Sequence, residues 1–279
     1  MFVDISPFDT PVAPTRLQRA NGALRLAFGR RGDITALKTL YQEGSAKARL
    51  PRAFWQPPEV VLINTAGGLA GGDSFSTEIT LDAEAALVAT TQACERVYRS
   101  IAGPAEVSTR LALGNGARLD WLPQETILFN GGMLRRRLEV DLAGSSEFLA
   151  VEAVLFGRTA MGESVRSGSF HDRWRIRREG RLLFADDVRL EGDIADQLAR
   201  PAVLGGNGAM ATIIFTGQDM DALLDPLRDL LGEGGGASAW GGKLLARIAA
   251  RDSLELRSRL IPALSLLMKG RPLPKVWQL

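Results

Sequence analysis

Two side chains that could do soft-metal or nucleophilic chemistry, His171 and Cys94, each occur once in the sequence. Transition-metal sites usually combine several histidine and cysteine ligands, so one copy of the chain cannot build such a site. A Ser-His-Asp or Cys-His arrangement would need His171 as its base, and no nucleophile elbow is present. We therefore interpret His171 as a partly exposed surface residue and Cys94 as a small core residue.

Acidic side chains are the other candidates for chemistry, and most of them are expected to be solvated or paired with arginines. Asp73 and Glu163 differ because each of them ends a glycine-containing turn. A carboxylate fixed at a turn can point into a cleft. Its oxygens can then handle a divalent cation weakly and transiently, which is a different task from holding it.

An enzymatic alternative also rests on carboxylates. Residues such as Glu125 and Glu152 could form the acid/base pair of a β-rich hydrolase or isomerase. That function requires the two groups to lie close together in an apolar pocket with separated pKa values.

The glycine-rich run at residues 67–73 does not indicate a nucleotide site. It follows a strand-like stretch at residues 60–63 and precedes another at residues 75–81, with no helix pattern between them. A dinucleotide fingerprint needs a helix whose amides face the pyrophosphate, and a Walker loop needs a lysine where Asp73 stands. The glycines therefore predict a tight, shaped turn.

Arginines are concentrated in two stretches, residues 135–137 and 173–181. If their strands are neighbours, these arginines could form a basic patch, although a solvated sheet face is the simpler interpretation. An acidic protein partner would suit such a patch better than RNA, because aromatic residues are not interleaved with the arginines. The net charge of +2 also gives no reason to expect a nucleic-acid partner.

Alternation of apolar and polar residues dominates residues 75–190 and predicts half-buried antiparallel strands. Gly114-Asn115-Gly116 and Glu179-Gly180 each separate two alternating stretches and are typical of hairpin turns. The predicted fold class is mainly β.

Two segments with leucines at helical spacing, residues 219–231 and 253–268, predict α-helices in the C-terminal third. Asp219 and Ser253 are the expected N-caps. Each segment contains a proline, so each helix should either be kinked or begin later.

The segment between these two predicted helices should contain a flexible glycine-rich connector at residues 232–236 and a strand at residues 243–249. No convincing internal repeat and no sharp domain boundary appears. Residues 1–279 are therefore expected to form a single domain.

Composition is that of an ordinary soluble globular protein, with 46% hydrophobic and 24% charged residues in 279. The first seven residues lack the features of a secretory signal, and no apolar run is long enough to span a bilayer. A single cysteine permits no internal disulfide, which is compatible with a reducing cytoplasm.

Five segments together resemble the UreD (also called UreH) family of urease accessory proteins. They occur in the family's order: GGLAGGD at residues 67–73, TTQACERVYRS at 90–100, LDWLPQETI at 119–127, FGRTAMGE at 156–163 and RPLPKVW at 271–277. The WLPQE stretch and the terminal LPxVW are particularly specific. Two positions depart from the family: Asn64-Thr65-Ala66 stands where many members have His-Pro-Pro, and Asn130 stands where aspartate is common.

This resemblance implies a mainly β fold of stacked, β-helix-like, antiparallel-rich sheets with two α-helices. It also implies a cytoplasmic, non-enzymatic chaperone that binds urease apoprotein and recruits UreF, and through it the GTPase UreG, for nickel insertion. No tightly bound cofactor, nucleic acid or membrane is expected. We expect Asp73 and Glu163 to line an internal polar passage for transiently handled nickel, and the C-terminal helical portion, residues 219–268, to contribute to the UreF surface.

Overall fold

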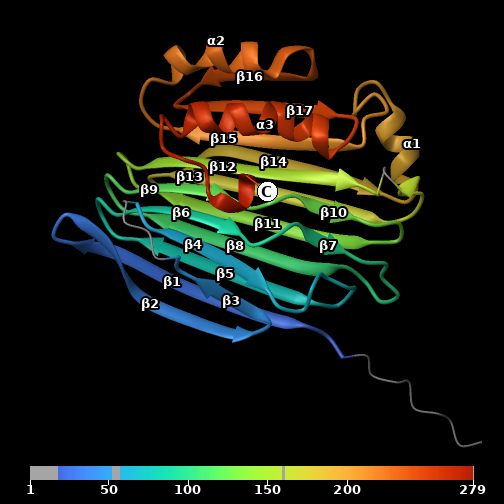
Figure 1. Ribbon diagram of the computed structural model, residues 1–279, viewed down its shortest axis with the longest axis horizontal. Helices are drawn as coiled ribbons and strands as arrows, with labels where there is room; N and C mark the ends of the chain where they lie inside the picture. The colour runs from blue at the N-terminus through green and yellow to red at the C-terminus, as the bar shows by residue number, and fades with distance from the viewer. Residues whose placement is uncertain (1–17, 52–56, 159–160, 279) are drawn as a thin grey trace, which may run out of the picture.

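The computed structural model describes residues 18–51, 57–158 and 161–278, whose strands form two stacked sheets (Figure 1). In spatial order, sheet A consists of β14 (Arg181–Glu191), β13 (Ser169–Arg178), β11 (Met133–Leu142), β8 (Ala105–Leu113), β5 (Ser74–Leu81), β1 (Asn21–Arg31) and β2 (Ile34–Gly44). Sheet B consists of β16 (Gly235–Trp240), β17 (Lys243–Ala250), β15 (Ala209–Thr216), β12 (Glu147–Phe156), β9 (Arg118–Leu122), β6 (Ala86–Thr91), β4 (Glu59–Asn64) and β3 (Ala46–Arg49), together with β10 (Thr126–Leu128) and β7 (Glu95–Val97). The prediction of a mainly β fold with stacked, β-helix-like sheets is confirmed.

From β5 to β13 the chain alternates between the two sheets, so that it winds as a solenoid. Equivalent strands of successive coils pair in parallel, as β5, β8, β11 and β13 do in sheet A. Antiparallel pairing is found among the outer strands, for example between β1 and β2 and between β15 and β17. The inner strands thus differ from the predicted antiparallel pairing, because a strand with one buried face shows the same alternation in either arrangement.

The two predicted hairpins have different outcomes. Glu179-Gly180 does connect the antiparallel pair β13 and β14. The hairpin at Gly114-Asn115-Gly116 is wrong, because β8 before it lies in sheet A and β9 after it lies in sheet B. The turn is a corner between sheets, where Gly114 N donates to Leu81 O of the preceding coil. The same small residues suit both kinds of turn.

The coils have unequal lengths, which explains why the sequence shows no repeat. Successive partners in sheet A are 32, 29 and 36 residues apart, as the pairs Ser74/Glu106, Ala105/Leu134 and Met133/Ser169 show. Since the period changes from coil to coil, no fixed spacing of apolar residues can develop.

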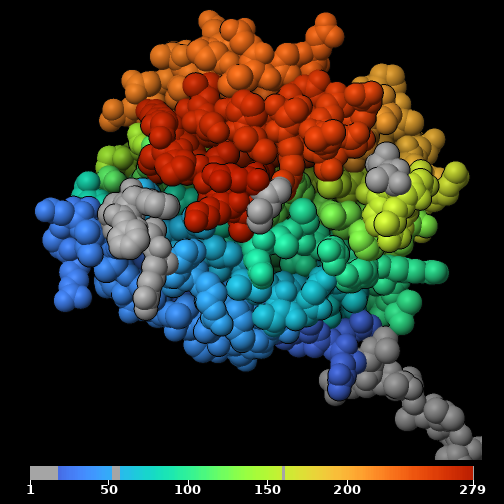
Figure 2. All heavy atoms as spheres, in the orientation of Figure 1, coloured from blue at the N-terminus to red at the C-terminus, as the bar shows by residue number. Residues whose placement is uncertain are grey.

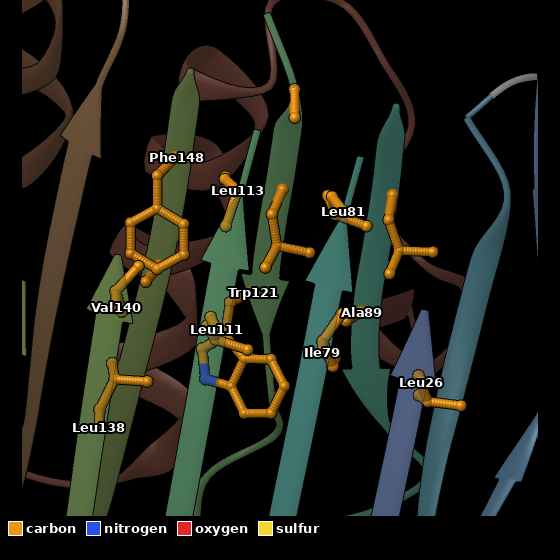
Figure 3. Packing of buried hydrophobic residues seen from close by; sticks show 14 of the residues in the cluster. Leu26, Ile79, Leu81, Ala89, Leu111, Leu113, Trp121, Leu138, Val140 and Phe148 are labelled. Atoms are coloured by element: carbon orange, nitrogen blue, oxygen red, sulfur yellow. The ribbon is translucent and has the colours of Figure 1, made fainter. Parts of the chain in front are cut away.

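Large apolar side chains from both sheets fill the solenoid interior (Figure 3). Ile79 and Leu111 of sheet A face Trp121 and Phe148 of sheet B in this core. The other face of sheet B is covered by α2 (Met220–Leu231) and α3 (Ser253–Leu267). Sheet B is therefore buried on both faces, whereas the outer face of sheet A carries mainly charged residues.

Both predicted C-terminal helices are present and begin where expected, although each contains a proline. The N-cap of α3 is Asp252 rather than Ser253, because Asp252 Oδ1 accepts a hydrogen bond from Glu255 N at 2.9 Å. Asp219 occupies the N-cap position of α2, with a φ of 61° and no capping bond from its side chain. A short helix, α1 (Ile194–Ala199), was not predicted.

The predicted flexible connector at residues 232–236 is instead ordered. It forms the 3-10 helix η2 (Gly232–Gly234) and the start of β16, which pairs with β17. The predicted strand at residues 243–249 is confirmed as β17. In the part of the chain that the structure describes, no helix combines the length and apolar character needed to cross a bilayer. Residues 1–7, on which the expectation of no secretory signal rests, lie outside the described residues.

Candidate functional site

A cavity of about 260 Å³ lies between the sheets, where two neighbouring strands of sheet B are interrupted. Residues 92–94 separate β6 from β7, and residues 123–125 separate β9 from β10. The lining includes the exposed residues Gly67, Gln92 and Arg96, so the cavity reaches the surface. Its lining combines apolar side chains such as Leu62 and Phe75 with the charged side chains of Glu95, Arg136 and Glu152.

Glu95 is a carboxylate in the lining of this cavity. Asn64 Nδ2 lies 3.2 Å from both of its oxygens and also donates to Gly68 O at 3.1 Å. Burial raises the pKa of Glu95 to about 7, although the bond from Asn64 opposes this shift. Near neutral pH, this carboxyl group therefore exchanges a proton and changes the charge of the cavity lining.

Arg136 crosses the solenoid interior from β11 and contacts two carboxylates. Its guanidinium forms a bidentate pair with Asp172, at 3.1 and 2.7 Å, and pairs with Glu152 of β12. Trp121 Nε1 donates to Glu152 Oε1 at 3.1 Å, and Trp174 Nε1 donates to Asp172 Oδ2 at 3.2 Å. Burial alone would lower the pKa of Arg136, but Asp172 and Glu152 outweigh it and raise that pKa. On the carboxyl group of Glu152 burial acts in the opposite direction, and it is the main cause of the raised pKa of Glu152.

Glu125 joins the wall of the cavity to α3. Arg257 Nε donates to Glu125 Oε1 at 2.6 Å, and Arg257 Nη2 donates to Gln124 Oε1 at 2.6 Å. Cys94 Sγ donates to Glu125 Oε2 at 3.3 Å. Burial would raise the pKa of Glu125, but the bonds from Arg257 outweigh it and lower that pKa.

Cys94 is only partly buried, so its interpretation as a core residue is wrong in that respect. Burial, followed by the charge of Glu125, raises the pKa of its thiol to about 11. A thiol with this pKa stays neutral near pH 7 and is a poor nucleophile.

The structure does not bring Glu125 and Glu152 together in one pocket. Glu152 lines the cavity, but Glu125 does not. Their pKa values are displaced in opposite directions, as the acid/base alternative requires, but each carboxylate is bound by an arginine. Nothing in this geometry favours the hydrolase or isomerase alternative.

Asp73 and Glu163 lie at corners of the solenoid, and neither lines the cavity. Asp73 is buried, and its carboxylate accepts hydrogen bonds from Ala20 N at 2.8 Å and Ala70 N at 2.7 Å. Glu163 lies 2.7 Å from Arg158 Nε, and this hydrogen bond is the main cause of its lowered pKa. Asp73 thus joins its corner to the residue before β1, whereas Glu163 pairs within its own corner.

The arginine-rich strands β11 and β13 are neighbours, as the basic-patch hypothesis required. Carboxylates nevertheless balance this face: Arg135 lies 2.6 Å from Glu106, and Arg110 lies 3.2 Å from Glu139. His171 is a partly exposed residue of this face, as predicted, and its Nε2 lies 2.7 Å from Asp187. The face therefore fits the simpler interpretation of a solvated, charge-balanced sheet surface.

Glu95 was not among the sequence-based site candidates. Arg136 was predicted only as a member of the basic patch at residues 135–137, and that placement is wrong because its side chain is buried in the interior. A signal for Arg136 exists, because it alternates in phase with Leu134 and Leu138, whose side chains face the interior. Glu95 has no comparable signal, since its strand β7 is only three residues long. Within residues 18–51, 57–158 and 161–278, no group of three or more His, Cys, Asp or Glu side chains is placed to hold a metal ion.

A family model described as UreD urease accessory protein matches residues 20–278 of this sequence. The chain belongs to the UreD family. A relative from Rhizobium etli named urease accessory protein UreD is 54% identical over 266 residues, covering 95% of this chain and 97% of that protein. One of the same name from Agrobacterium fabrum is 52% identical, covering 95% and 94%, and urease accessory protein UreD 1 from Brucella abortus is 46% identical, covering 96% and 98%.

The segments that carry the UreD resemblance gather around the cavity and the solenoid corners. Residues 90–100 and 119–127 contain the two interruptions in sheet B, and residues 67–73 form the corner from β4 to β5. The C-terminal segment lies against the second interruption, since Trp277 Nε1 donates to Leu122 O at 3.0 Å.

The asparagines at both positions that depart from the UreD pattern form hydrogen bonds within the fold. Asn64 binds Glu95 at the cavity, as described above. The side-chain oxygen of Asn130 accepts hydrogen bonds from Arg166 N at 2.9 Å and Ser167 N at 3.0 Å. An aspartate could accept the same two bonds, so this substitution preserves the corner while removing a charge.

Proposed function

We propose that this protein is a non-catalytic chaperone of urease maturation that works in the cytoplasm. It binds urease apoprotein and recruits UreF, and through UreF the GTPase UreG, so that nickel reaches the urease active site. The observation that carries this proposal is the match of the UreD family model to residues 20–278, with relatives of about full length named as urease accessory proteins.

The chemistry of the interior supports a role in handling the metal rather than storing it. The described residues contain no cluster of metal ligands, and the sequence has one histidine and one cysteine. Weak, exchangeable contacts from carboxylate oxygens suit an ion that must be passed on. Tight nickel binding and GTP hydrolysis then belong to the partners.

We infer that carboxylates of this chain bind nickel transiently. The sequence indicates Asp73 and Glu163 as candidates, and the cavity adds Glu95. Glu163→Gln keeps an acceptor oxygen for Arg158, and Asp73→Asn keeps one for a single backbone amide while turning an NH2 group toward the other, whereas alanine at Asp73 would leave both backbone amides without their partner. If the double variant activates urease normally at limiting nickel while Glu95→Gln does not, the passage involves the cavity rather than Asp73 and Glu163.

The C-terminal helical portion, residues 219–268, supplies part of the UreF surface in this proposal. Its exposed apolar residues include Leu254, which is 80% exposed, and Trp240, which is 48% exposed. Truncation after Gln218 is an unsuitable test, because it would strip β17 from its partner β15 in sheet B and remove α3 from the core that covers this sheet. Leu254→Glu and Trp240→Glu test the surface without removing the core, and UreF binding unchanged in the double variant would contradict it.

The decisive experiment is reconstitution with purified components. Urease apoprotein is incubated with UreF, UreG, GTP and limiting nickel, with and without this chain, and urease activity is measured. We expect activation to depend on this chain and the chain to co-purify with urease subunits. Full activation without it, or substrate turnover by the isolated chain, would overturn the proposal.

A further inference from the structure

Four corners that lead from sheet B to sheet A are stacked along one side of the solenoid. They comprise residues 65–73, 98–104, 129–132 and, in the last corner, the described residues 157–158 and 161–168, and they lie on the right-hand side of Figure 1, beyond β7 and β10, and on the same side of Figure 2. Backbone hydrogen bonds link neighbouring corners: Tyr98 N donates to Leu69 O, Ser100 N to Gly131 O, and Gly131 N to Ser167 O. These bonds hold the exposed side chains of the corners on one connected backbone surface.

Aromatic and arginine side chains form a continuous row across these corners. Tyr98 OH donates to Gly67 O at 3.2 Å, and its ring meets Phe129 edge-on with centroids 5.3 Å apart. The guanidinium of Arg158 lies over the Phe129 ring, 4.7 Å from its centroid. Arg99 lies across Gly131, where a Cβ atom would come within 2.8 Å of Arg99 Cγ. We call this surface the corner ridge. It is defined by Tyr98, Arg99, Phe129, Arg158 and Arg166 of the corners, together with Arg96 of the adjoining strand β7, which also lines the mouth of the cavity.

The charge of the corner ridge is unbalanced. Arg96, Arg99 and Arg166 are exposed, and none of them forms an ion pair with a carboxylate among the residues that the structure describes. Glu163 lies beside the ridge, but it is already paired with Arg158. On the outer face of sheet A, by comparison, several arginines are paired with carboxylates, as Arg110 is with Glu78 and Glu139.

We propose that the corner ridge docks an acidic segment of a protein partner, an inference that rests on the proposed function above. Arginine and tyrosine are the residue types that most often carry interface binding energy, and here both are fixed by neighbouring corners. Unpaired arginines favour carboxylates, which they can bind through two parallel hydrogen bonds. RNA fits less well, because single-stranded bases bind by stacking on open aromatic faces, and Arg158 covers a face of Phe129.

The test compares two sets of arginines that carry the same charge. The ridge variant is Arg96→Glu/Arg99→Glu/Arg166→Glu. Its control, Arg137→Glu/Arg177→Glu/Arg181→Glu, changes three arginines of β11, β13 and β14 that also lack an ion pair among the described residues. The affinity of each purified variant for urease apoprotein is measured at two salt concentrations. Thermal melting followed by circular dichroism checks that each variant is folded. Glutamine variants at the same three ridge positions form a second set.

We expect the ridge variant to bind roughly ten-fold or more weakly and with less salt dependence, and the control to stay within about two-fold. If both variants lose affinity for urease apoprotein equally, or if only the control loses it, docking at the corner ridge is contradicted while the proposed function stands. Binding of a labelled single-stranded RNA that the ridge variant loses would assign the ridge to nucleic acid and also overturn the proposal. Failure of the unmodified chain to bind urease apoprotein would contradict both the ridge and the proposed function.

Discussion

The guanidinium of Arg136, on β11 of sheet A, pairs with the carboxylate of Glu152, on β12 of sheet B, inside the solenoid. Both side chains are more than nine-tenths buried, and Asp172 completes the network from β13. This ion pair fixes the position of β11 relative to β12 more specifically than apolar contacts would, because a buried charge must lie within reach of its partner. Arg136 and Glu152 also line the cavity, so the network lies where the apolar core meets it.

Replacing Arg136 with methionine should lower the free energy of unfolding by about 3–5 kcal/mol, because Glu152 and Asp172 would be left buried without their cation. Urea unfolding measures the change. Arg137→Met is the matched control, since Arg137 is exposed and lacks an ion pair among the described residues, and it should change stability by less than about 0.5 kcal/mol. A loss below about 1 kcal/mol for Arg136→Met would show that the network contributes little.

Glu95 should make stability depend on pH. Its pKa is about 7 in the folded protein, above the ordinary value of 4.5 for a glutamate, so its favourable contribution to stability is complete below pH 4.5 and is lost as the pH rises through 7. Glu95→Gln should remove this loss. We expect the variant to gain about 2 kcal/mol relative to the unmodified chain between pH 5 and pH 8, because partial solvent access reduces the full effect of the shift. Urea midpoints at the two pH values measure this gain.

Glu139→Gln, on the outer face of sheet A, is the control for Glu95→Gln. A stability difference between Glu95→Gln and the unmodified chain that stays constant from pH 5 to pH 8 would contradict the raised pKa.

Parts of the fold were predictable because their signals are local. The leucines of α2 and α3 recur at helical spacing, and Glu179-Gly180 joins two strands that are adjacent in both sequence and space. Parallel pairing of the inner strands was not predictable, since the partners of Ser74 and Met133 lie 32 and 36 residues away with nothing in the sequence to fix that distance.

The site was less predictable than the fold, because its chemistry depends on burial. Asp73 was singled out for its position at a glycine turn, and the structure shows its oxygens bonded to backbone amides. Glu95 lies in residues 90–100, one of the segments that resemble the UreD family. Only its place beside the interruption of sheet B and its contact with Asn64 distinguish it from the other carboxylates in these segments. Such differences arise from long-range packing, which local sequence patterns do not record.

Cys94 should react slowly with thiol reagents in the folded protein. A pKa of about 11, against an ordinary value of 9.0 for a cysteine, reduces the thiolate fraction at pH 8 roughly 100-fold. Because the sequence has one cysteine, the reaction with a chromogenic disulfide reports this residue alone. The same chain in denaturant is the control, and a folded protein that reacts as fast as the unfolded one would contradict the prediction. Glu125→Gln should accelerate the folded reaction, since it removes a negative charge beside the thiol.

Trp277 should anchor the C-terminal segment to sheet B. Its side chain is 1% exposed, its Nε1 donates to Leu122 O at 3.0 Å, and Arg257 lies 5.7 Å from its ring centroid. Trp277→Ala should cost about 3–5 kcal/mol of unfolding free energy, because it leaves a large cavity and removes the indole donor from the end of β9. Trp240→Ala is the matched control: that ring is 48% exposed, so its loss should cost less than about 1 kcal/mol. Thermal and urea unfolding of both variants measure the contrast, and equal losses would mean that the C-terminal segment does not stabilise the second interruption of sheet B.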